Sequence, residues 1–236
     1  KEFVDLERTT PMHEWHKQNG AKFEDVGQWK RAWYYPKERE SFSSALNREV
    51  KATRDSLGIL DASTLGKIDI QGRDVSEFLN RIYTNAWSKL EIGKCRYGVM
   101  LGDDGMVMDD GVTTRLGEYH YIMSTTTGNA ASVMSKLEDW LQTEWPELEV
   151  YLTSVTEQYG TISLNGPNSR KLMEKLNSDY DFSKDNFPHM SFKNINLCGV
   201  ECRVMRISFT GELCYEINVP SGYAKQIWDI CIDKGQ

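Results

Sequence analysis

Several features are missing from this sequence, and each absence excludes a class of functions or partners. No run of about eighteen consecutive apolar residues is present, so no membrane-spanning helix and no membrane partner are expected. Basic residues are outnumbered, with 28 Lys and Arg against 35 Asp and Glu and a formal net charge of −7. Since phosphate binding requires a positive face, nucleic acid is not expected as a partner.

Cysteine is scarce and dispersed. The chain has 5 cysteines, and this odd number of widely spaced residues does not indicate a disulfide framework. Cys198 and Cys202 have no second Cys or His pair nearby, and His13 and His16 lack a third ligand, so no metal site is predicted. We expect a surface or capping role for His13 and His16, and reduced thiols that favour a cytoplasmic location.

Motifs for nucleotide binding and nucleophilic catalysis are also absent. The chain has no Gly-x-Gly-x-x-Gly fingerprint, no phosphate-binding loop and no Gly-x-Ser-x-Gly turn. What remains is an ordinary globular composition, with 39% hydrophobic and 27% charged residues in a chain of 236. This length suits one large domain or two small units that share a core.

The first forty residues are rich in aromatics and turn formers but show little periodicity. Trp29, Trp33, Tyr34 and Tyr35 fall close together in this stretch. We expect an irregular N-terminal arm here. Its aromatics would either anchor the arm to the core or form a stacking wall for a flat ligand.

From residue 41 onward the hydrophobic pattern alternates between helical and strand periods. It predicts helices over 41–57, 75–82, 130–141, 169–176 and 223–232, and strands over 67–71, 97–101, 106–114, 118–124, 161–165, 200–209 and 214–219. The segments 67–73 and 161–167 both predict a strand, a Gly and a helix, and a hairpin and another helix follow each. The sequence therefore predicts an α+β fold of two related antiparallel-sheet units, with an arm and first helix over 1–60, one unit over 61–155 and another over 156–236.

Three carboxylates interrupt apolar strand patterns. Asp109 and Asp110 are adjacent, and adjacent strand residues point to opposite faces, so one of them faces inward. An inward carboxylate binds a ligand or is satisfied by hydrogen bonds from the protein itself. Glu216 suits a ligand with two neighbouring N–H groups, such as a pterin ring, or else forms a structural ion pair.

The order of the motifs along the chain is distinctive. It runs through 11–23, 27–29, 54–63, 97–101, 105–110, 165–168 and 210–216. In this order the motifs resemble the folate-binding aminomethyltransferase family, typified by the glycine cleavage system T protein. Segments 19–31, 33–36 and 125–130 are most similar to the C-terminal part of the alpha chain of heterotetrameric sarcosine oxidases.

This resemblance implies a single folate-binding module with tetrahydrofolate as its cofactor. It implies a catalytic role for Asp109 and folate contacts for Tyr97, Glu216 and Leu65. Two further folate-binding positions depart from the glycine cleavage pattern, with Phe209 in place of Tyr and Thr125 in place of Asn. It also implies that the family's C-terminal β-domain lies beyond these residues, so the isolated chain is expected to be inactive.

The implied reaction captures the carbon from sarcosine demethylation as 5,10-methylenetetrahydrofolate. Asp109 would stabilise the cationic carbon, and proximity would supply much of the rate. The implied partners are folate, a small one-carbon substrate and the other sarcosine oxidase subunits, with FAD, FMN and NAD elsewhere in the complex. A stand-alone aminomethyltransferase of glycine cleavage and a non-catalytic folate-binding module are the alternatives.

Overall fold

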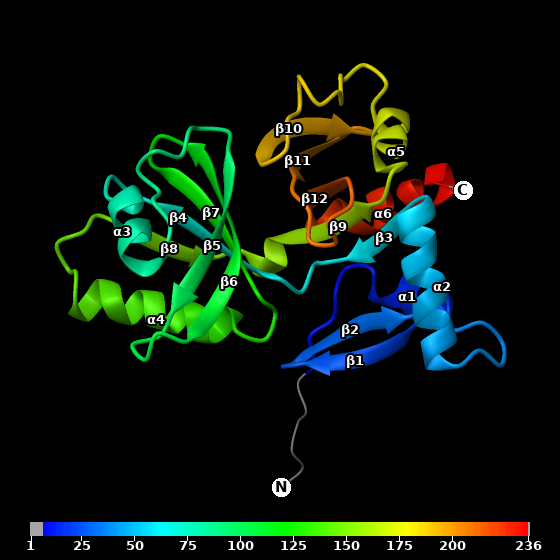
Figure 1. The fold of residues 1–236 in the computed structure, drawn as a ribbon, viewed down its shortest axis with the longest axis horizontal. Helices are drawn as coiled ribbons and strands as arrows, with labels where there is room; N and C mark the ends of the chain where they lie inside the picture. The colour runs from blue at the N-terminus through cyan, green and yellow to red at the C-terminus, as the bar shows by residue number, and fades with distance from the viewer. Residues whose placement is uncertain (1–6, 236) are drawn as a thin grey trace, which may run out of the picture. The chain divides into compact units, whose positions relative to one another are not determined.

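The computed structural model describes residues 7–235, which divide into two compact units. The first unit contains residues 7–64, 157–189 and 193–235, and the second contains 65–156 and 190–192. Figure 1 shows both units as separate groups of strands and helices. Residues 7–60 therefore pack with the C-terminal part of the chain.

The N-terminal segment is largely regular from residue 13 onward, and residues 1–6 of the expected arm lie outside the described residues. It forms helix α1 (His13–Gln18), a hairpin of β1 (Lys22–Val26) and β2 (Trp29–Tyr34), and helix α2 (Phe42–Asp55). The prediction of an irregular arm is wrong because Gly27, at φ +59°, closes a tight turn that short-range periodicity does not reveal. The predicted helix over 41–57 is confirmed, and Ser41 begins it by accepting the Ser44 amide at 3.3 Å.

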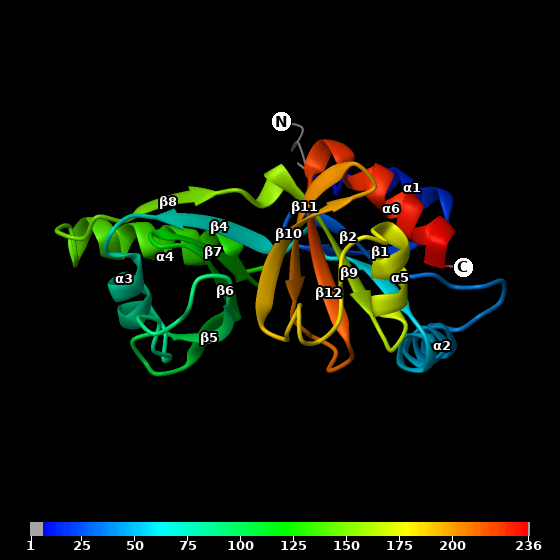
Figure 2. The same cartoon turned by 90° about the horizontal axis from the view of Figure 1, so that it is seen from above.

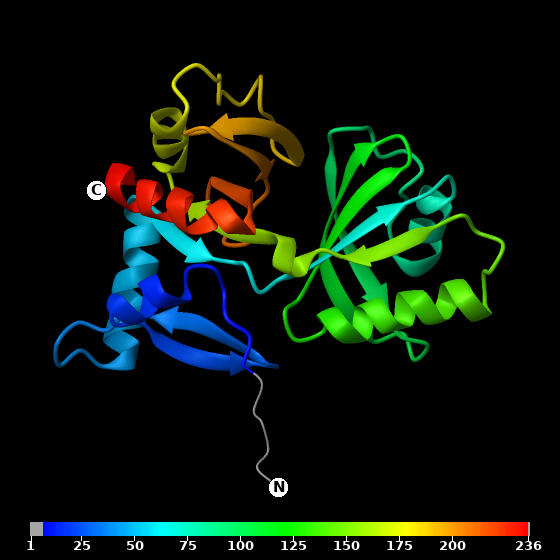
Figure 3. The same ribbon diagram turned by 180° about the vertical axis from the view of Figure 1, so that it is seen from behind.

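The first unit is built on a five-stranded sheet in the order β10-β11-β12-β9-β3. Its strands are β3 (Gly58–Asp61), β9 (Tyr159–Asn165), β10 (Ser191–Leu197), β11 (Val200–Arg206) and β12 (Cys214–Pro220). Strands β10, β11 and β12 are neighbours in this sheet (Figure 2). Helices α5 (Ser169–Leu176) and α6 (Ser221–Gly235) cover one face, and α6 lies against β9 and β12 (Figure 3). Ile162, Tyr215 and Trp228 lie in the core between this face and the helices.

The second unit repeats this arrangement with a five-stranded sheet in the order β5-β6-β7-β4-β8. Its strands are β4 (Gly66–Gln71), β5 (Cys95–Leu101), β6 (Val107–Gly117), β7 (His120–Thr125) and β8 (Tyr151–Ser154). Helices α3 (Val75–Ile82) and α4 (Ala130–Thr143) supply core residues such as Phe78 and Val133, which pack with Ile68 and Met123 of the sheet.

The internal repeat is visible in the turns between strand and helix. Gly72 joins β4 to α3 at φ +138°, and Gly166 joins β9 to α5 at φ +121°. A Cβ at Gly72 would lie 1.9 Å from the Glu149 carbonyl oxygen, and one at Gly166 would lie 2.4 Å from that of Thr53. Only glycine therefore fits either turn. The predicted α+β fold with two related antiparallel units is confirmed. Over the described range, no helix is both long and apolar enough to cross a membrane.

Candidate functional site

The sheet of the second unit packs one face on α3 and α4. The opposite face is buried at Val112, Ile122 and Lys67 but exposed along β5, and we call this exposed part the open face. Tyr97, Val99 and Leu101 of β5 lie on the open face, exposed by 45%, 36% and 36%. Strand pairing places Asp110 directly opposite Val99, so the exposed Asp110 carboxylate is on this face as well. Three apolar side chains and one carboxylate are thus presented together by two neighbouring strands.

Asp109 points the other way and is 4% exposed. Its Oδ1 accepts hydrogen bonds from the Thr126 hydroxyl at 2.6 Å and the Asn129 side-chain amide at 3.3 Å. Its Oδ2 accepts the Thr126 backbone amide at 3.2 Å. The prediction that Asp109 and Asp110 face opposite sides is confirmed, and the Asp109 carboxylate anchors the loop between β7 and α4.

Two other predicted residues of this unit lie where β7 ends and β4 begins. Thr125 is 2% exposed and pairs across the strands with Gly66, where a Cβ would lie only 2.1 Å from the Thr125 hydroxyl oxygen. Leu65 is half-buried, and its carbonyl oxygen accepts the Lys67 ammonium at 3.0 Å. Leu65 and Thr125 therefore lie at neighbouring strand ends, while Asp109 accepts its hydrogen bonds from the residues that follow Thr125.

Lys67 was missed in the sequence analysis. It is 4% exposed, and its pairing with Ser124 places it on the side of the sheet that carries Asp110 and Tyr97. A lysine is almost never this buried without a polar partner. Its position in an otherwise alternating strand was the available signal, because the alternation directs Ile68 and Ile70 to the core and Lys67 away from it.

Glu216 lies in the middle of the other sheet. Its neighbours Tyr215 and Ile217 are fully buried in the core beneath α5 and α6, so Glu216 points to the face away from these helices. Strand pairing places it between Met205 of β11 and Ser163 of β9. The carboxylate is half-buried within a sheet face rather than at a fraying edge.

Phe209 lies in the loop between β11 and β12 and is 95% exposed. Gly211 takes φ +84° within this loop, and the Ser208 hydroxyl donates to the Glu212 carbonyl oxygen at 2.7 Å. Arg54 of α2 ties the loop down through Glu212 at 2.6 Å. The loop is thus held at both ends while it presents a fully exposed aromatic ring.

His16 does not have the surface or capping role expected from the sequence. It is 1% exposed, with its Nε2 2.8 Å from the Asp61 carboxylate and its Nδ1 2.6 Å from the Tyr35 hydroxyl. Burial alone would raise the pKa of Asp61, but hydrogen bonds from His16 and Ser63 outweigh it and lower that pKa. This network, formed by residues far apart in sequence, fixes the segment that leads into Leu65.

Comparison with known proteins identifies the family. The chain belongs to the family of the GCVT N-terminal domain, which matches residues 12–236. Over the whole chain it is 56% identical to the sarcosine oxidase subunit alpha of Corynebacterium sp. (strain U-96), and over 97% of the chain it is 43% identical to that of Rhizobium meliloti (strain 1021). Over 99% of its length it is 30% identical to the aminomethyltransferase of Thermoanaerobacter sp. (strain X514).

The chain spans only part of these relatives, namely 24% and 23% of the two alpha subunits and 60% of the aminomethyltransferase. Among solved structures, glycine cleavage system aminomethyltransferase T from Bartonella henselae superimposes with a TM-score of 0.79 at 23% identity, over 95% of this chain and 57% of that one. A chain of heterotetrameric sarcosine oxidase from Corynebacterium sp. U-96 superimposes with a TM-score of 0.54 at 13% identity, over 84% of this chain and 95% of that one. These structures confirm the fold, and the resemblance found in the sequence is confirmed.

Proposed function

We propose that this chain is the folate-dependent one-carbon transfer module of a sarcosine oxidase alpha chain. The observation that carries the proposal is the 56% identity to sarcosine oxidase alpha subunits over the full chain, against 30% for the aminomethyltransferase. When bound, tetrahydrofolate supplies a nucleophilic amine that accepts the carbon released from sarcosine. Flavins and NAD are assigned to other parts of the assembly, which we expect to be cytoplasmic.

The side chains of each unit fit a reduced folate by their chemistry. A carboxylate accepts two N–H groups at once, and Glu216 offers one on a sheet face where the adjacent strands present Ser163 and Met205. On the second unit, Tyr97, Val99 and Leu101 form an exposed, largely apolar row that suits a flat ring. We assign Glu216 to the pterin N–H groups and Tyr97 to a ring contact.

The two adjacent carboxylates of β6 lie on opposite faces of the sheet, and we assign a different role to each. Asp110 is exposed beside Tyr97 and Val99, so its charge can approach a cationic carbon in a ligand on the open face. Asp109, the residue singled out as catalytic from the sequence, holds the Thr126–Asn129 loop through its hydrogen bonds. The geometry favours electrostatic catalysis by Asp110 and a positioning role for Asp109.

The remaining assignments follow from exposure. Phe209, at 95% exposure, is available to pack on a ligand and contributes no hydroxyl group. Thr125 is buried, so we assign it to shaping the strand end beside Leu65 rather than to a polar contact with folate.

A stand-alone aminomethyltransferase is the second candidate. The 30% identity to the aminomethyltransferase of Thermoanaerobacter sp. over 99% of this chain supports it. The two candidates differ in the carbon donor, which is sarcosine in one case and an aminomethyl group on a carrier in the other.

The test uses the full-length protein with its natural subunits. Sarcosine is supplied with and without tetrahydrofolate, and free formaldehyde and 5,10-methylenetetrahydrofolate are measured. The proposal expects tetrahydrofolate to lower formaldehyde release and to yield the methylene derivative in equal amount. Formaldehyde release that is indifferent to tetrahydrofolate would refute it, and turnover only with an aminomethylated carrier would favour the second candidate.

A further inference from the structure

The first sheet carries an arginine whose guanidinium lacks a hydrogen-bond acceptor. Arg203 of β11 is half-buried, and its neighbours Cys202 and Val204 are buried in the core, so its side chain points to the face of the sheet that carries Glu216. The Arg203 Nε and Nη1 atoms are closed to solvent, and no residue of 7–235 accepts a hydrogen bond from them. No carboxylate in this part of the chain forms an ion pair with the guanidinium.

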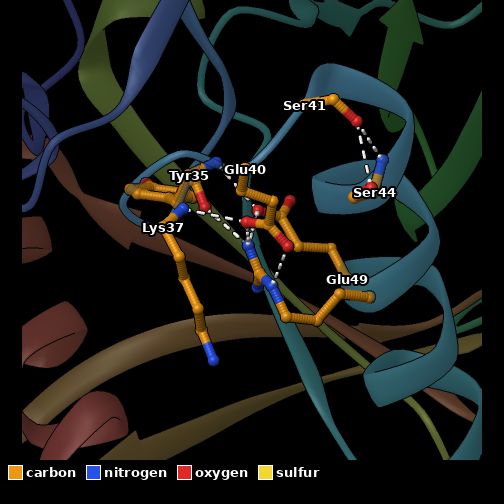
Figure 4. A network of polar contacts seen from close by, with 7 residues as sticks. Tyr35, Lys37, Glu40, Ser41, Ser44 and Glu49 are labelled. Atoms are coloured by element: carbon orange, nitrogen blue, oxygen red, sulfur yellow. Dashed lines mark hydrogen bonds and ion pairs between the residues drawn. The ribbon is translucent and has the colours of Figure 1, made fainter.

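A guanidinium without an acceptor is costly. Arginine stays protonated in proteins, and a buried charge without a partner lowers stability. Arg48 shows the usual arrangement in the same unit, because it donates to both Glu40 carboxylate oxygens at 3.0 and 2.8 Å and to the Tyr35 carbonyl oxygen at 2.7 Å (Figure 4). Arg203 instead has a cation–π contact, with its Cζ 5.5 Å from the centre of the Tyr159 ring. This contact orients the guanidinium but does not neutralise its charge.

Asn218 presents a second donor beside Arg203. The two residues are directly opposite each other in the pairing of β11 with β12, and both neighbours of Asn218 are buried in the core, so its side chain lies on the same face. The Thr161 hydroxyl donates to Asn218 Oδ1 at 2.8 Å, while Asn218 Nδ2 has the Met205 sulfur as its acceptor at 4.0 Å. Since a thioether is a weak acceptor, the amide and the guanidinium together can donate N–H groups to an oxygen ligand.

We infer that Arg203 and Asn218 form a binding site for the carboxylate group of a small ligand. A carboxylate supplies the negative charge that the guanidinium lacks, and its two oxygens accept N–H groups from both side chains. The site lies about 7 Å along β12 from Glu216, which is two residues away on the same face. The inference rests on the proposed function, which brings two carboxylates to this module, namely the glutamyl tail of a reduced folate and the carboxylate of the amino acid that carries the carbon.

The test measures binding by calorimetric titration in the full-length protein with its natural subunits. Arg203→Met removes the guanidinium, and Asn218→Asp keeps an acceptor for the Thr161 hydroxyl while it places a competing carboxylate opposite Arg203. Arg48→Met is the matched control, because it removes the same group from an arginine that already has its acceptors. The probes are 5-formyltetrahydrofolate, glycine and 6-methyltetrahydropterin, which has no carboxylate. Urea unfolding shows whether each variant is folded, and glycine bound at the flavin is measured separately by flavin absorbance.

We expect Arg203→Met and Asn218→Asp each to weaken binding of one carboxylate probe by at least about tenfold, while Arg48→Met leaves it unchanged. Weaker binding of 5-formyltetrahydrofolate identifies the glutamyl tail as the ligand, and weaker binding of glycine identifies the amino acid. Binding of 6-methyltetrahydropterin should be equal in all variants.

The inference is overturned if Arg203→Met binds both carboxylates as tightly as Arg48→Met does, or if the unsubstituted protein binds neither. It is also overturned if binding of 6-methyltetrahydropterin is weakened as much as that of 5-formyltetrahydrofolate. If Arg203→Met does not fold, the same criteria apply to Asn218→Asp. Glycine binding that depends on Arg203, in a protein that binds neither reduced pterin, would support the site and refute the proposed function.

Discussion

The two carboxylates of β6 allow a matched pair of substitutions. Asp109→Asn and Asp110→Asn remove the same charge from adjacent residues of one strand. They differ in environment, because Asp109 is 4% exposed and accepts hydrogen bonds from Thr126 and Asn129, whereas Asp110 is exposed on the face that carries Tyr97. We therefore expect Asp109→Asn to lower the free energy of unfolding and Asp110→Asn to slow the transfer reaction.

The expected changes in stability and in transfer rate follow from these contacts. In Asp109→Asn the new amide group directs N–H bonds at a donor, either the Thr126 backbone amide or the Asn129 amide, whichever way it is turned. One buried hydrogen bond is lost and two donors oppose each other, at a cost of about 1–3 kcal/mol in the free energy of unfolding. Asp110→Asn should change that free energy by less than about 0.5 kcal/mol. Removing a charge that stabilises a cationic carbon should slow transfer by on the order of 10²-fold.

The assay combines urea unfolding with product analysis in the full assembly. We expect Asp110→Asn to keep normal stability, reduce the flavin with sarcosine at the normal rate, and release free formaldehyde in place of 5,10-methylenetetrahydrofolate. We expect Asp109→Asn to lose stability and to retain transfer at temperatures where it is folded. If Asp109→Asn is stable but slow in transfer while Asp110→Asn is silent, the catalytic charge is Asp109 and the argument from the open face is refuted.

Three further predictions concern separate parts of the chain. Glu216→Ala should weaken binding of a reduced folate by about 30-fold or more, because a charge-assisted pair worth about 2–3 kcal/mol is lost; calorimetric titration that finds equal affinity in a folded variant would contradict the assignment. Gly166→Ala should lower the free energy of unfolding by about 3 kcal/mol or more, since its Cβ would meet the Thr53 and Ser56 carbonyl oxygens at 2.4 and 2.6 Å. Gly222→Ala in α6, where a Cβ meets nothing within 4 Å, is its control and should be neutral or stabilising in chemical denaturation. The hydrogen bond from Arg48 lowers the pKa of Glu40 to about 2. In Arg48→Met the Glu40 carboxyl should therefore titrate nearer its ordinary range, as measured by carbon-13 NMR. An unchanged titration would show that the Arg48 hydrogen bond does not cause the low pKa.

The elements that the sequence predicted best are those with a strong local period. The helices expected over 75–82 and 169–176 begin and end at those residues, and those over 130–141 and 223–232 differ by a few residues at their ends. Each carries apolar residues on one face that packs on its own sheet, so local periodicity and tertiary packing agree.

Elements stabilised by contacts distant in sequence were missed. Strand β3 (Gly58–Asp61) is only four residues long and pairs with β9, about a hundred residues further along the chain. Strand β10 (Ser191–Leu197) has only three buried residues, which makes it hard to recognise from its own pattern. Edge strands of this kind show weak alternation, because their formation depends on a neighbour already in place.

The same limit applies to the candidate site. Alternation alone established that Asp109 and Asp110 face opposite sides, but it did not establish which side is which. That depends on the pairing of Met100 with Asp109 and of Val99 with Asp110, and on helices α3 and α4 covering the Met100 side. A shift of one residue in this pairing would exchange the environments of the two carboxylates. The β5–β6 register therefore decides which of the two carboxylates can reach a ligand. Substituting each residue separately tests this register as well as the chemistry.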